Sequence, residues 1–262
     1  MCRMVALSAR GSFDARPWLR ALAEAAFDDP LLRELSRGDA SHSDGWGLAA
    51  LSGDRLLHYR SAAPIWVDGA LDALAGLLAA PVALVAHARK ASAGTPLGVG
   101  AAHPFPLDTR DGGVLFVAQN GGVAVIKLAG LIEEKPLLDS VDTFVYSVAL
   151  AERLKRAGLA EVLAELHRDL EKLGAIRGMA NTFVLLVKRE RGSWKAELAV
   201  VRHIVRESLR EYGEVFVANR PGFFAAVSST LALKLQTGMD PIRENSVIAI
   251  DPESERSARL PL

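Results

Sequence analysis

The only cysteine of the chain is its second residue, Cys2. If Met1 is removed, Cys2 carries a thiol and a free α-amine on the same residue. A deprotonated thiol is a strong nucleophile, and an α-amine with a pKa of about 7.7–8.0 is a usable base at neutral pH. One residue then supplies both the nucleophile and the proton acceptor. An isolated cysteine is otherwise more often a small, buried apolar residue, so the evidence must come from elsewhere in the sequence.

Four further segments contain residue types that are used in catalysis: 42–47 (HSDGWG), 87–92 (HARKAS), 119–122 (QNGG) and 140–143 (SVDT). Each has an ordinary structural interpretation as well. Arg89 can be a surface arginine at the end of a strand, and Asp142 a helix N-cap. Asn120-Gly121 after a strand is also a common hairpin signal. No single segment is therefore diagnostic, and only their combination is informative.

In this order and spacing, starting from a cysteine at position two, the segments resemble the class II glutamine amidotransferases, which are N-terminal-nucleophile hydrolases. The likeness is greatest to stand-alone members that begin Met-Cys and carry an Asp-Gly-Trp-Gly strand. The motifs lie between Met1 and Thr143, and the remainder of the chain matches only by its strand pattern. The resemblance implies a four-layer αββα sandwich of two antiparallel sheets flanked by helices, in the α+β class, with 1–262 as a single domain.

The resemblance also assigns roles to five residues. Cys2 is the expected nucleophile, and Asn120 and Gly121 are expected to form the oxyanion hole. Arg89 is expected to bind the α-carboxylate of the substrate, for which a guanidinium fork is well suited, and Asp142 its α-ammonium group.

The implied reaction is hydrolysis of the γ-amide of glutamine through a γ-glutamyl thioester, with release of ammonia and glutamate. No cofactor and no metal are required. Five other residues in matching segments are expected to form scaffold around the pocket: His42, Asp44, Trp46, His103 and Phe105.

Two residues depart from the family pattern. Gln119 stands where a histidine usually precedes Asn-Gly, and Phe144 stands where a glutamate usually follows Asp-Thr. Neither is the nucleophile, the base or the main oxyanion donor, so we expect catalysis to survive. The substrate preference is open, and a γ-glutamyl peptide amidohydrolase acting on thiol metabolites is the alternative enzyme. A catalytically inactive ligand-binding subunit is the alternative of a different class.

Composition limits the partners of the protein. Lys and Arg number 31 and Asp and Glu also number 31, so the formal net charge is zero. A nucleic-acid or acidic-membrane partner would favour a basic excess, and we expect neither. We expect no secretory signal, and the most apolar stretch, 73–86, is too short to span a bilayer. We therefore expect a cytoplasmic protein that binds glutamine or another γ-glutamyl small molecule, with a separate ammonia-accepting synthase subunit if the ammonia is used.

Apolar spacing predicts the elements that must position these residues. Helices are expected over 16–35, with a break at Pro30, and over 68–78, 140–156 and 159–173. Strands are expected over 1–8 and 46–51. A hairpin at 52–54 is expected to lead to a second strand that ends near residue 59. Further strands are expected over 82–88, 114–118, 181–188, 194–202, 214–218, 223–227 and 246–250. The segment 89–111 has no clear period and is expected to be one long functional loop.

Overall fold

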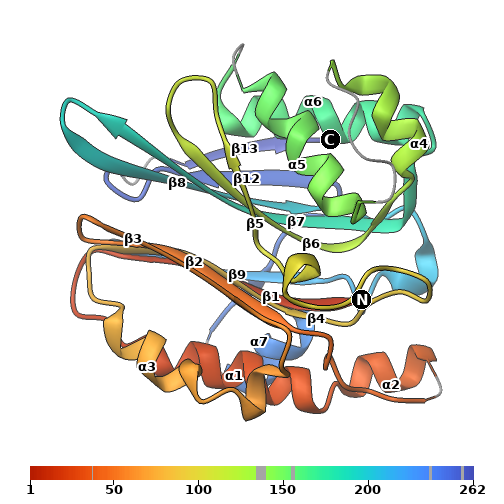
Figure 1. Cartoon of the computed structure of the whole chain (residues 1–262), viewed down its shortest axis with the longest axis horizontal. Helices are drawn as coiled ribbons and strands as arrows, with labels where there is room; N and C mark the ends of the chain where they lie inside the picture. The colour runs from red at the N-terminus through yellow and green to blue at the C-terminus, as the bar shows by residue number, and fades with distance from the viewer. Residues whose placement is uncertain (37, 134–139, 155–156, 236–237, 255–256) are drawn as a thin grey trace.

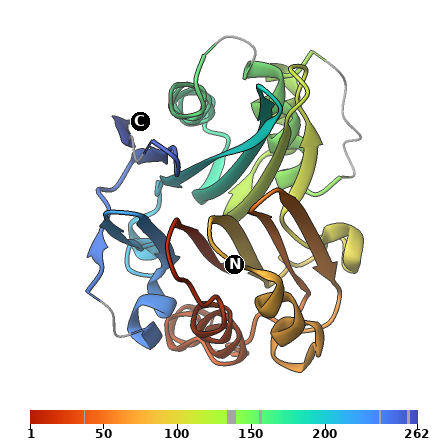
Figure 2. The same ribbon diagram turned by 90° about the vertical axis from the view of Figure 1, so that its left-hand side faces the viewer.

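The computed structural model describes residues 1–36, 38–133, 140–154, 157–235, 238–254 and 257–262. Two antiparallel sheets lie face to face, and helices cover the outer face of each (Figures 1 and 2). The predicted four-layer αββα sandwich is confirmed. Because each sheet is covered on both faces, the central strands are buried along most of their length.

The first sheet has seven strands in the order β11-β9-β10-β1-β4-β2-β3. Their bounds are β1 (Cys2–Ala9), β2 (Trp46–Ser52), β3 (Arg55–Ser61), β4 (Val82–Arg89), β9 (Val215–Arg220), β10 (Phe223–Ser228) and β11 (Asp240–Pro241). The first strand of the chain, β1, is central and pairs antiparallel with β10 on one side and β4 on the other. This pairing places Cys2 at the end of a fully buried strand.

The second sheet has six strands in the order β13-β12-β8-β7-β6-β5. Their bounds are β5 (Phe105–Asp108), β6 (Val114–Val123), β7 (Ile176–Glu190), β8 (Ser193–Arg202), β12 (Ser246–Ile250) and β13 (Ser257–Pro261). The strand β6, which carries Asn120, pairs with β7 and β5. The nucleophile expected from the sequence and the expected oxyanion hole therefore belong to different sheets.

The helices form the two outer layers (Figure 1). The first sheet is covered by α1 (Arg16–Phe27), α2 (Pro30–Ser36), α3 (Ala70–Leu77) and α7 (Ser229–Leu235), and the second by α4 (Val125–Leu128), α5 (Asp142–Arg153) and α6 (Leu159–Lys172). Short 3₁₀ turns are η1 (Ile65–Val67), η2 (Val99–Ala101), η3 (Ala129–Leu131) and η4 (Glu207–Leu209).

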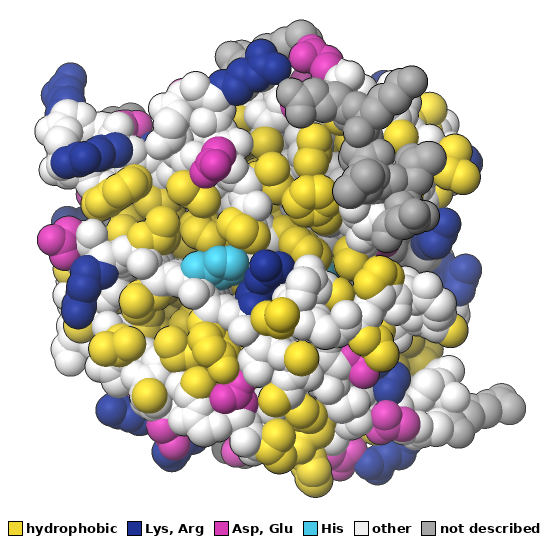
Figure 3. Space-filling model, viewed as in Figure 1, with side chains coloured by type: hydrophobic (Ala, Val, Ile, Leu, Met, Phe, Trp, Pro, Cys, Tyr) yellow, Lys and Arg dark blue, Asp and Glu magenta, His cyan; other side chains and the backbone are white. Residues whose placement is uncertain are grey.

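Alternation of side chains along β1 explains how the core is divided. Met4 joins the apolar cluster between the two sheets, whereas Val5 and Leu7 join the cluster under the helices of the first sheet. Successive side chains of a strand point to opposite faces, so both faces must be apolar in a central strand. The inter-sheet cluster reaches the surface through partly buried residues, and hydrophobic side chains are spread across the middle of the face in Figure 3.

The structure corrects several sequence expectations. The segment 89–111 is not one continuous loop, since it contains η2 and the edge strand β5. A four-residue edge strand is too short to give a recognisable period. The strands β6 and β7 extend beyond their predicted ends, and α4, α7, β11 and β13 were not predicted. The helix predicted over 140–156 is α5, which ends at Arg153; residues 155 and 156 lie outside the described part.

A buried ionic cluster fixes β1 to the helical layer beneath it. Arg3 donates from Nε to Asp29 Oδ2 at 2.6 Å, and His42 Nε2 lies 2.8 Å from the same oxygen. Thr230 donates to the other oxygen, Asp29 Oδ1, at 2.7 Å. The Arg3 and Asp29 side chains are both fully buried. Removing one member of such a pair leaves an uncompensated charge in the interior.

We expect Asp29→Asn to lower the free energy of unfolding by about 3–5 kcal/mol, because it leaves the Arg3 guanidinium buried and unpaired. Asp72→Asn is the matched control, since the Asp72 side chain is 62% exposed and pairs with an exposed Arg20; a change within about 0.5 kcal/mol is expected there. Urea titration of both variants measures the difference. Equal stability of the two variants would contradict a dependence of the fold on this cluster.

The same cluster makes stability depend on pH. Burial raises the pKa of Asp29, but the hydrogen bond from His42 and the charge of Arg3 outweigh it and hold the pKa well below its usual range. Burial lowers the pKa of His42 to about 4, against the opposing hydrogen bond to Asp29. The unfolded chain, with ordinary values of about 3.9 and 6.5, therefore binds protons first as the pH falls.

This linkage predicts that stability is fully present above about pH 6.5 and decreases as the pH falls, first through His42 and then, below about pH 4, through Asp29. Urea titrations at pH 7, 5.5 and 4 measure the trend. His42→Gln removes the contribution of this residue and is expected to make the curve shallower between pH 7 and 5.5, where other buried histidines with lowered pKa values, such as His103 and His167, still contribute. A wild-type curve that is already flat over that interval would refute the prediction.

Candidate active site

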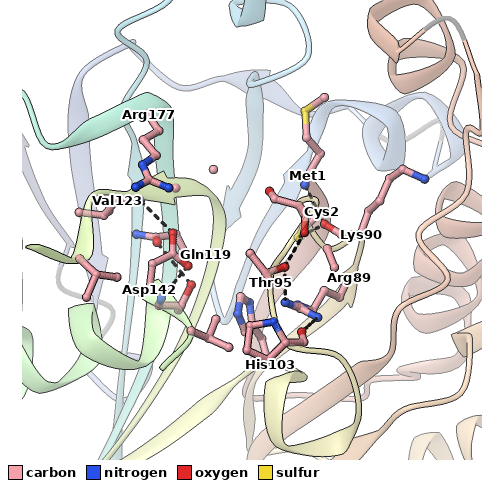
Figure 4. Close-up of a pocket in the computed structure, with 18 of the residues that line it drawn as sticks. Met1, Cys2, Arg89, Lys90, Thr95, His103, Gln119, Val123, Asp142 and Arg177 are labelled. Carbon is pink, nitrogen blue, oxygen red and sulfur yellow. Dashed lines mark hydrogen bonds between the residues drawn. The ribbon is translucent and has the colours of Figure 1, made fainter. Parts of the chain in front are cut away.

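A cavity of about 810 Å³ lies where the ends of β1 and β4 meet the ends of β6 and α5. Four of the five predicted site residues line it: Cys2, Arg89, Gly121 and Asp142. Figure 4 shows Cys2 and Arg89 on one wall and Asp142 on the facing wall. The fifth residue, Asn120, is 1% exposed and lies behind the wall, in contact with Cys2. Tertiary folding thus brings together residues that are up to 140 positions apart.

Cys2 is held by hydrogen bonds from both sheets. It pairs with Arg89 in the register of β1 and β4, and its backbone N–H donates to Asn120 Oδ1 at 2.8 Å. Its Sγ lies 4.0 Å from the carbonyl oxygen of Lys90. In the described chain, Met1 precedes Cys2 and its terminal ammonium donates to the same carbonyl at 2.8 Å.

The Cys2 thiol is buried and yet easily ionised. Burial raises its pKa, but the adjacent His87 ring and the terminal ammonium favour the thiolate more strongly and bring the pKa down to about 6. A low thiol pKa next to cationic or imidazole groups is typical of reactive cysteines, whereas inert buried cysteines have raised values. Of the two interpretations of the lone cysteine, its surroundings match the reactive one.

Arg89 presents a positive charge that no acid of the described chain neutralises by an ion pair. Its Nη1 donates to the carbonyl oxygen of Pro96 at 2.9 Å, and its Nη2 contacts Thr95 Oγ1 at 3.5 Å. These neutral partners fix the guanidinium at the cavity wall without cancelling its charge. The arrangement suits an anionic group of a ligand.

Asp142 is the first residue of α5 and connects it to the end of β6. Its Oδ2 accepts a hydrogen bond from the Val123 N–H at 2.9 Å, and its Oδ1 accepts one from the Thr143 N–H at 2.9 Å. The N-cap predicted for Asp142 is wrong, since Val141 occupies that position without a side-chain cap; Asp142 instead ties the first turn of α5 to β6 and also lines the cavity. A carboxylate accepts several hydrogen bonds at once, so both roles are compatible.

Asn120-Gly121 is not the turn of a two-residue hairpin. Both residues lie within β6, and the pairing with β7 is irregular between Gly121 and Val123. Gly121 has φ +131°, and a Cβ atom there would overlap the carbonyl group of Met179. Only glycine fits this backbone, because L side chains rarely adopt such angles. The bulge directs this short stretch into the cavity.

The two departures from the family pattern have separate structural explanations. Gln119 donates to Thr182 Oγ1 at 3.2 Å and accepts from Thr143 Oγ1 at 3.4 Å, so it ties α5 to the sheet. Phe144 packs edge-on against Phe105, with 5.9 Å between ring centroids. Residues two apart on a helix do not face each other, so Phe144 does not point in the direction of Asp142.

The predicted scaffold residues occupy different places around the site. Asp44 accepts a hydrogen bond from the Ala91 N–H at 2.8 Å, which fixes the chain after Arg89. Trp46 packs in the apolar cluster under the helices of the first sheet and donates to Asp68, whereas His103 lines the cavity itself. Gly47 allows the backbone at His103 to approach β2 closely, since a Cβ there would overlap its carbonyl oxygen.

Sequence reasoning did not find several residues of the site. Thr95 and Pro96, which hold Arg89, lie in a segment without a period. Asp29, which belongs to the ionic cluster beneath β1 and accepts from the Leu32 N–H at 3.3 Å, was not singled out from the sequence. Arg177 lines the cavity from β7. Its position four residues before the predicted start of that strand gave no functional signal.

Within the described ranges, no group of three or more His, Cys, Asp or Glu side chains is arranged to hold a metal ion. No described helix is both long and apolar enough to cross a membrane.

Comparison with known proteins shows the fold. No family model and no curated protein matches the chain. Among solved structures it is similar to an allosteric regulatory enzyme of purine biosynthesis (17% identity, TM-score 0.63). It is also similar to the glutamine phosphoribosylpyrophosphate amidotransferase of B. subtilis in complex with ADP and GMP (17% identity, TM-score 0.60). Both matches cover 98% of this chain, which spans about half (49%) of each of theirs.

A third similar structure has the same extent as this chain. It is a glutamine aminotransferase class-II domain protein from Silicibacter pomeroyi, with 16% identity, a TM-score of 0.58 and 98% coverage of both chains. The chain therefore shares the fold of these three structures.

The backbone at Gly121 gives a prediction for the site. Gly121→Ala is expected to lower the free energy of unfolding by about 2 kcal/mol or more, because the new Cβ overlaps the Met179 carbonyl at a strained φ. Gly130→Ala is the control, since a Cβ there meets nothing within 4 Å. Thermal unfolding of both variants is the measurement. A Gly121→Ala protein as stable as Gly130→Ala would show that the bulge relaxes freely.

Proposed function

We propose that the protein is a class II glutamine amidotransferase or glutaminase that hydrolyses the γ-amide of glutamine, with Cys2 as the first residue of the mature chain. The observation that carries the proposal is the hydrogen bond between the Cys2 N–H and Asn120 Oδ1, made at a cavity that Arg89 and Asp142 also line. The resemblance of the motifs and the fold of the similar structures support it.

Substrate binding follows from the charges at the cavity. Arg89 holds the α-carboxylate through a guanidinium that is already fixed by Pro96 and Thr95. Asp142 accepts the α-ammonium group with lone pairs that its two backbone hydrogen bonds leave free. The γ-amide is thereby directed to Cys2, which lies on the same wall as Arg89 and faces Asp142 (Figure 4). Positioning of this kind is a large part of the catalytic gain in amide hydrolysis.

The chemical steps use the same atoms. The Cys2 thiolate attacks the γ-carbonyl carbon, and the oxyanion is stabilised by the Asn120 side-chain amide and the Gly121 N–H. The α-amine of Cys2, held at Asn120 Oδ1, accepts the thiol proton as the thiolate forms and then gives it to the departing ammonia. Water then hydrolyses the γ-glutamyl thioester and releases glutamate.

A γ-glutamyl peptide amidohydrolase is the second candidate, and two observations favour it. The cavity of about 810 Å³ falls in the range of about 300–1,000 Å³ typical of drug-sized ligands, and glutamine is smaller than these. Arg177, at the end of the cavity opposite Arg89 (Figure 4), forms no ion pair with a described residue and can bind an anionic leaving group. The glutamyl half of the substrate binds in the same way in both candidates.

The proposal is tested by measuring glutamate release after intact-mass analysis has established that the mature chain begins at Cys2. Release from glutamine supports the glutaminase, and release from γ-glutamyl peptides alone supports the second candidate. Absence of release from both substrates, by a protein that begins at Cys2, would contradict both enzymes and indicate a binding subunit. A synthase subunit that accepts the ammonia is an expected partner of the glutaminase.

Cys2→Ala is expected to abolish turnover and to retain substrate binding, because Arg89 and Asp142 are unchanged. Isothermal titration calorimetry of the inactive variant measures that binding. Arg89→Lys is the matched comparison: it keeps the charge but loses the fork geometry, so weaker binding is expected. Residual turnover in Cys2→Ala would exclude Cys2 as the nucleophile.

Asn120→Ala is expected to reduce kcat by about 10²–10³, because one oxyanion donor is lost. Asn219→Ala is the control: Asn219 also lies near the end of a strand, β9, followed by Arg220, but it is exposed and outside the cavity. Steady-state kinetics of the two variants gives the comparison. An unchanged kcat in Asn120→Ala would remove Asn120 from the oxyanion hole.

A further inference from the structure

Two histidines are buried side by side next to Cys2, and the mechanism above does not use them. His87 lies in β4, and His103 precedes β5. The Nδ1 atom of His103 is 2.9 Å from Nε2 of His87, and the same Nε2 is 3.3 Å from the carbonyl oxygen of Gln119. Both side chains are almost completely inaccessible, at 0% and 3% exposure.

Strand register places His87 beside the nucleophile. In the antiparallel pair β1 and β4, Cys2 is opposite Arg89 and Met4 is opposite His87. Cys2 and His87 are thus diagonal neighbours on the face between the sheets, a separation that aromatic side chains can bridge.

Both imidazoles have a ring nitrogen without a partner. Nδ1 of His87 and Nε2 of His103 are buried and form no hydrogen bond within the described part of the chain. A buried polar atom without a hydrogen bond lowers the stability of the fold by about 1–3 kcal/mol. The presence of two such nitrogen atoms side by side therefore calls for an explanation. His87 uses one nitrogen for His103 and Gln119, which leaves the other for the group beside it.

We propose that His87 is a second proton acceptor for the Cys2 thiol and that His103 is a positioning residue that sets its tautomer. This inference rests on the proposed function in taking Cys2 as the nucleophile. The Cys2 S–H bond breaks, its electron pair stays on sulfur, and the proton forms an N–H bond at Nδ1 of His87. Nε2–H of the resulting imidazolium is stabilised by the Gln119 carbonyl oxygen and by Nδ1 of His103. The proton is later available to the departing nitrogen.

The charges around the pair fit this assignment. Burial lowers the pKa of His103 well below its usual value, and the neighbouring His87, Arg89, terminal ammonium and Arg60 lower it further. His103 therefore stays neutral and presents a lone pair at Nδ1 to the N–H of His87. A nucleophile, a base and a third group that orients the base are the parts of a catalytic triad.

The test is the pH dependence of alkylation by iodoacetamide, which reports the thiolate of the only cysteine without requiring turnover. Wild-type reactivity is expected to rise with a midpoint near the Cys2 pKa of about 6. His87→Asn is expected to move the midpoint towards the free-cysteine value of about 8.5, which lowers the rate at pH 7 by about thirtyfold. His103→Asn is expected to shift it in the same direction by less.

His58→Asn is the control, because the His58 ring contacts the Pro104 carbonyl oxygen and the Phe116 ring and does not line the cavity; its alkylation curve is expected to match the wild type. Circular dichroism checks that each variant is folded, and if His87→Asn is not, His103→Asn carries the test alone. An unchanged midpoint in the folded His87→Asn protein, or in His103→Asn when only that variant folds, overturns the proposal.

Retention of Met1 separates the two bases. A variant in which Met1 is kept has no Cys2 α-amine, and we expect its thiol still to ionise near pH 6 and to depend on His87. If ionisation instead required a free Cys2 amine, His87 would not be an acceptor. Alkylation does not involve glutamine. The alkylation result therefore tests the role of His87 even if the glutamate assay contradicts the proposed function.

Discussion

The hydrogen bond from the Cys2 N–H to Asn120 Oδ1 is the contact on which the site depends, because it joins the two sheets at the nucleophile. Cys2 belongs to the sheet that contains β1, and Asn120 to the sheet that contains β6. Apolar packing between sheets is non-directional, so it sets their spacing but not the alignment of two particular atoms. A buried hydrogen bond at 2.8 Å supplies that alignment.

The rest of the fold keeps β1 in place. The strand is central, so hydrogen bonds to β10 and β4 fix its register in the sheet. The cluster of Arg3, Asp29 and His42 fixes it to the helices below. His42 also lies 3.2 Å from the Met1 carbonyl oxygen through Nδ1, so the cluster reaches the peptide that precedes Cys2. A buried ion pair of this kind contributes little net stability relative to apolar residues. Its role here is to orient β1: because successive side chains of a strand point to opposite faces, fixing the Arg3 side chain towards the helices directs the Cys2 side chain to the other face.

The cavity combines fixed charges with a nucleophile that ionises easily. Arg89 is held by neutral oxygen atoms and keeps its charge for a ligand, while Asp142 serves both the start of α5 and the cavity wall. His87 and His103 lie behind the thiol with nitrogen atoms that no other described group satisfies. Groups whose surroundings shift their protonation are typical of active sites. The similar structures share the scaffold, and the chemistry proposed for this chain rests on these side chains.

The sequence by itself determined the residue types of the site and most of the secondary structure. The break of the first helix at Pro30 and the strand at 82–88 both follow from short-range effects: proline interrupts a helix, and a short apolar run favours a buried strand. Only the tertiary structure decided that Asn120 lies behind the wall while Gly121 lines it, because a bulge depends on the partner strand. The ion pair of Arg3 with Asp29 and the contact of His87 with His103 were also invisible, since each joins residues from separate elements. Side-chain spacing encodes which face of a strand is buried, but which distant groups meet there is decided by the packing of two sheets.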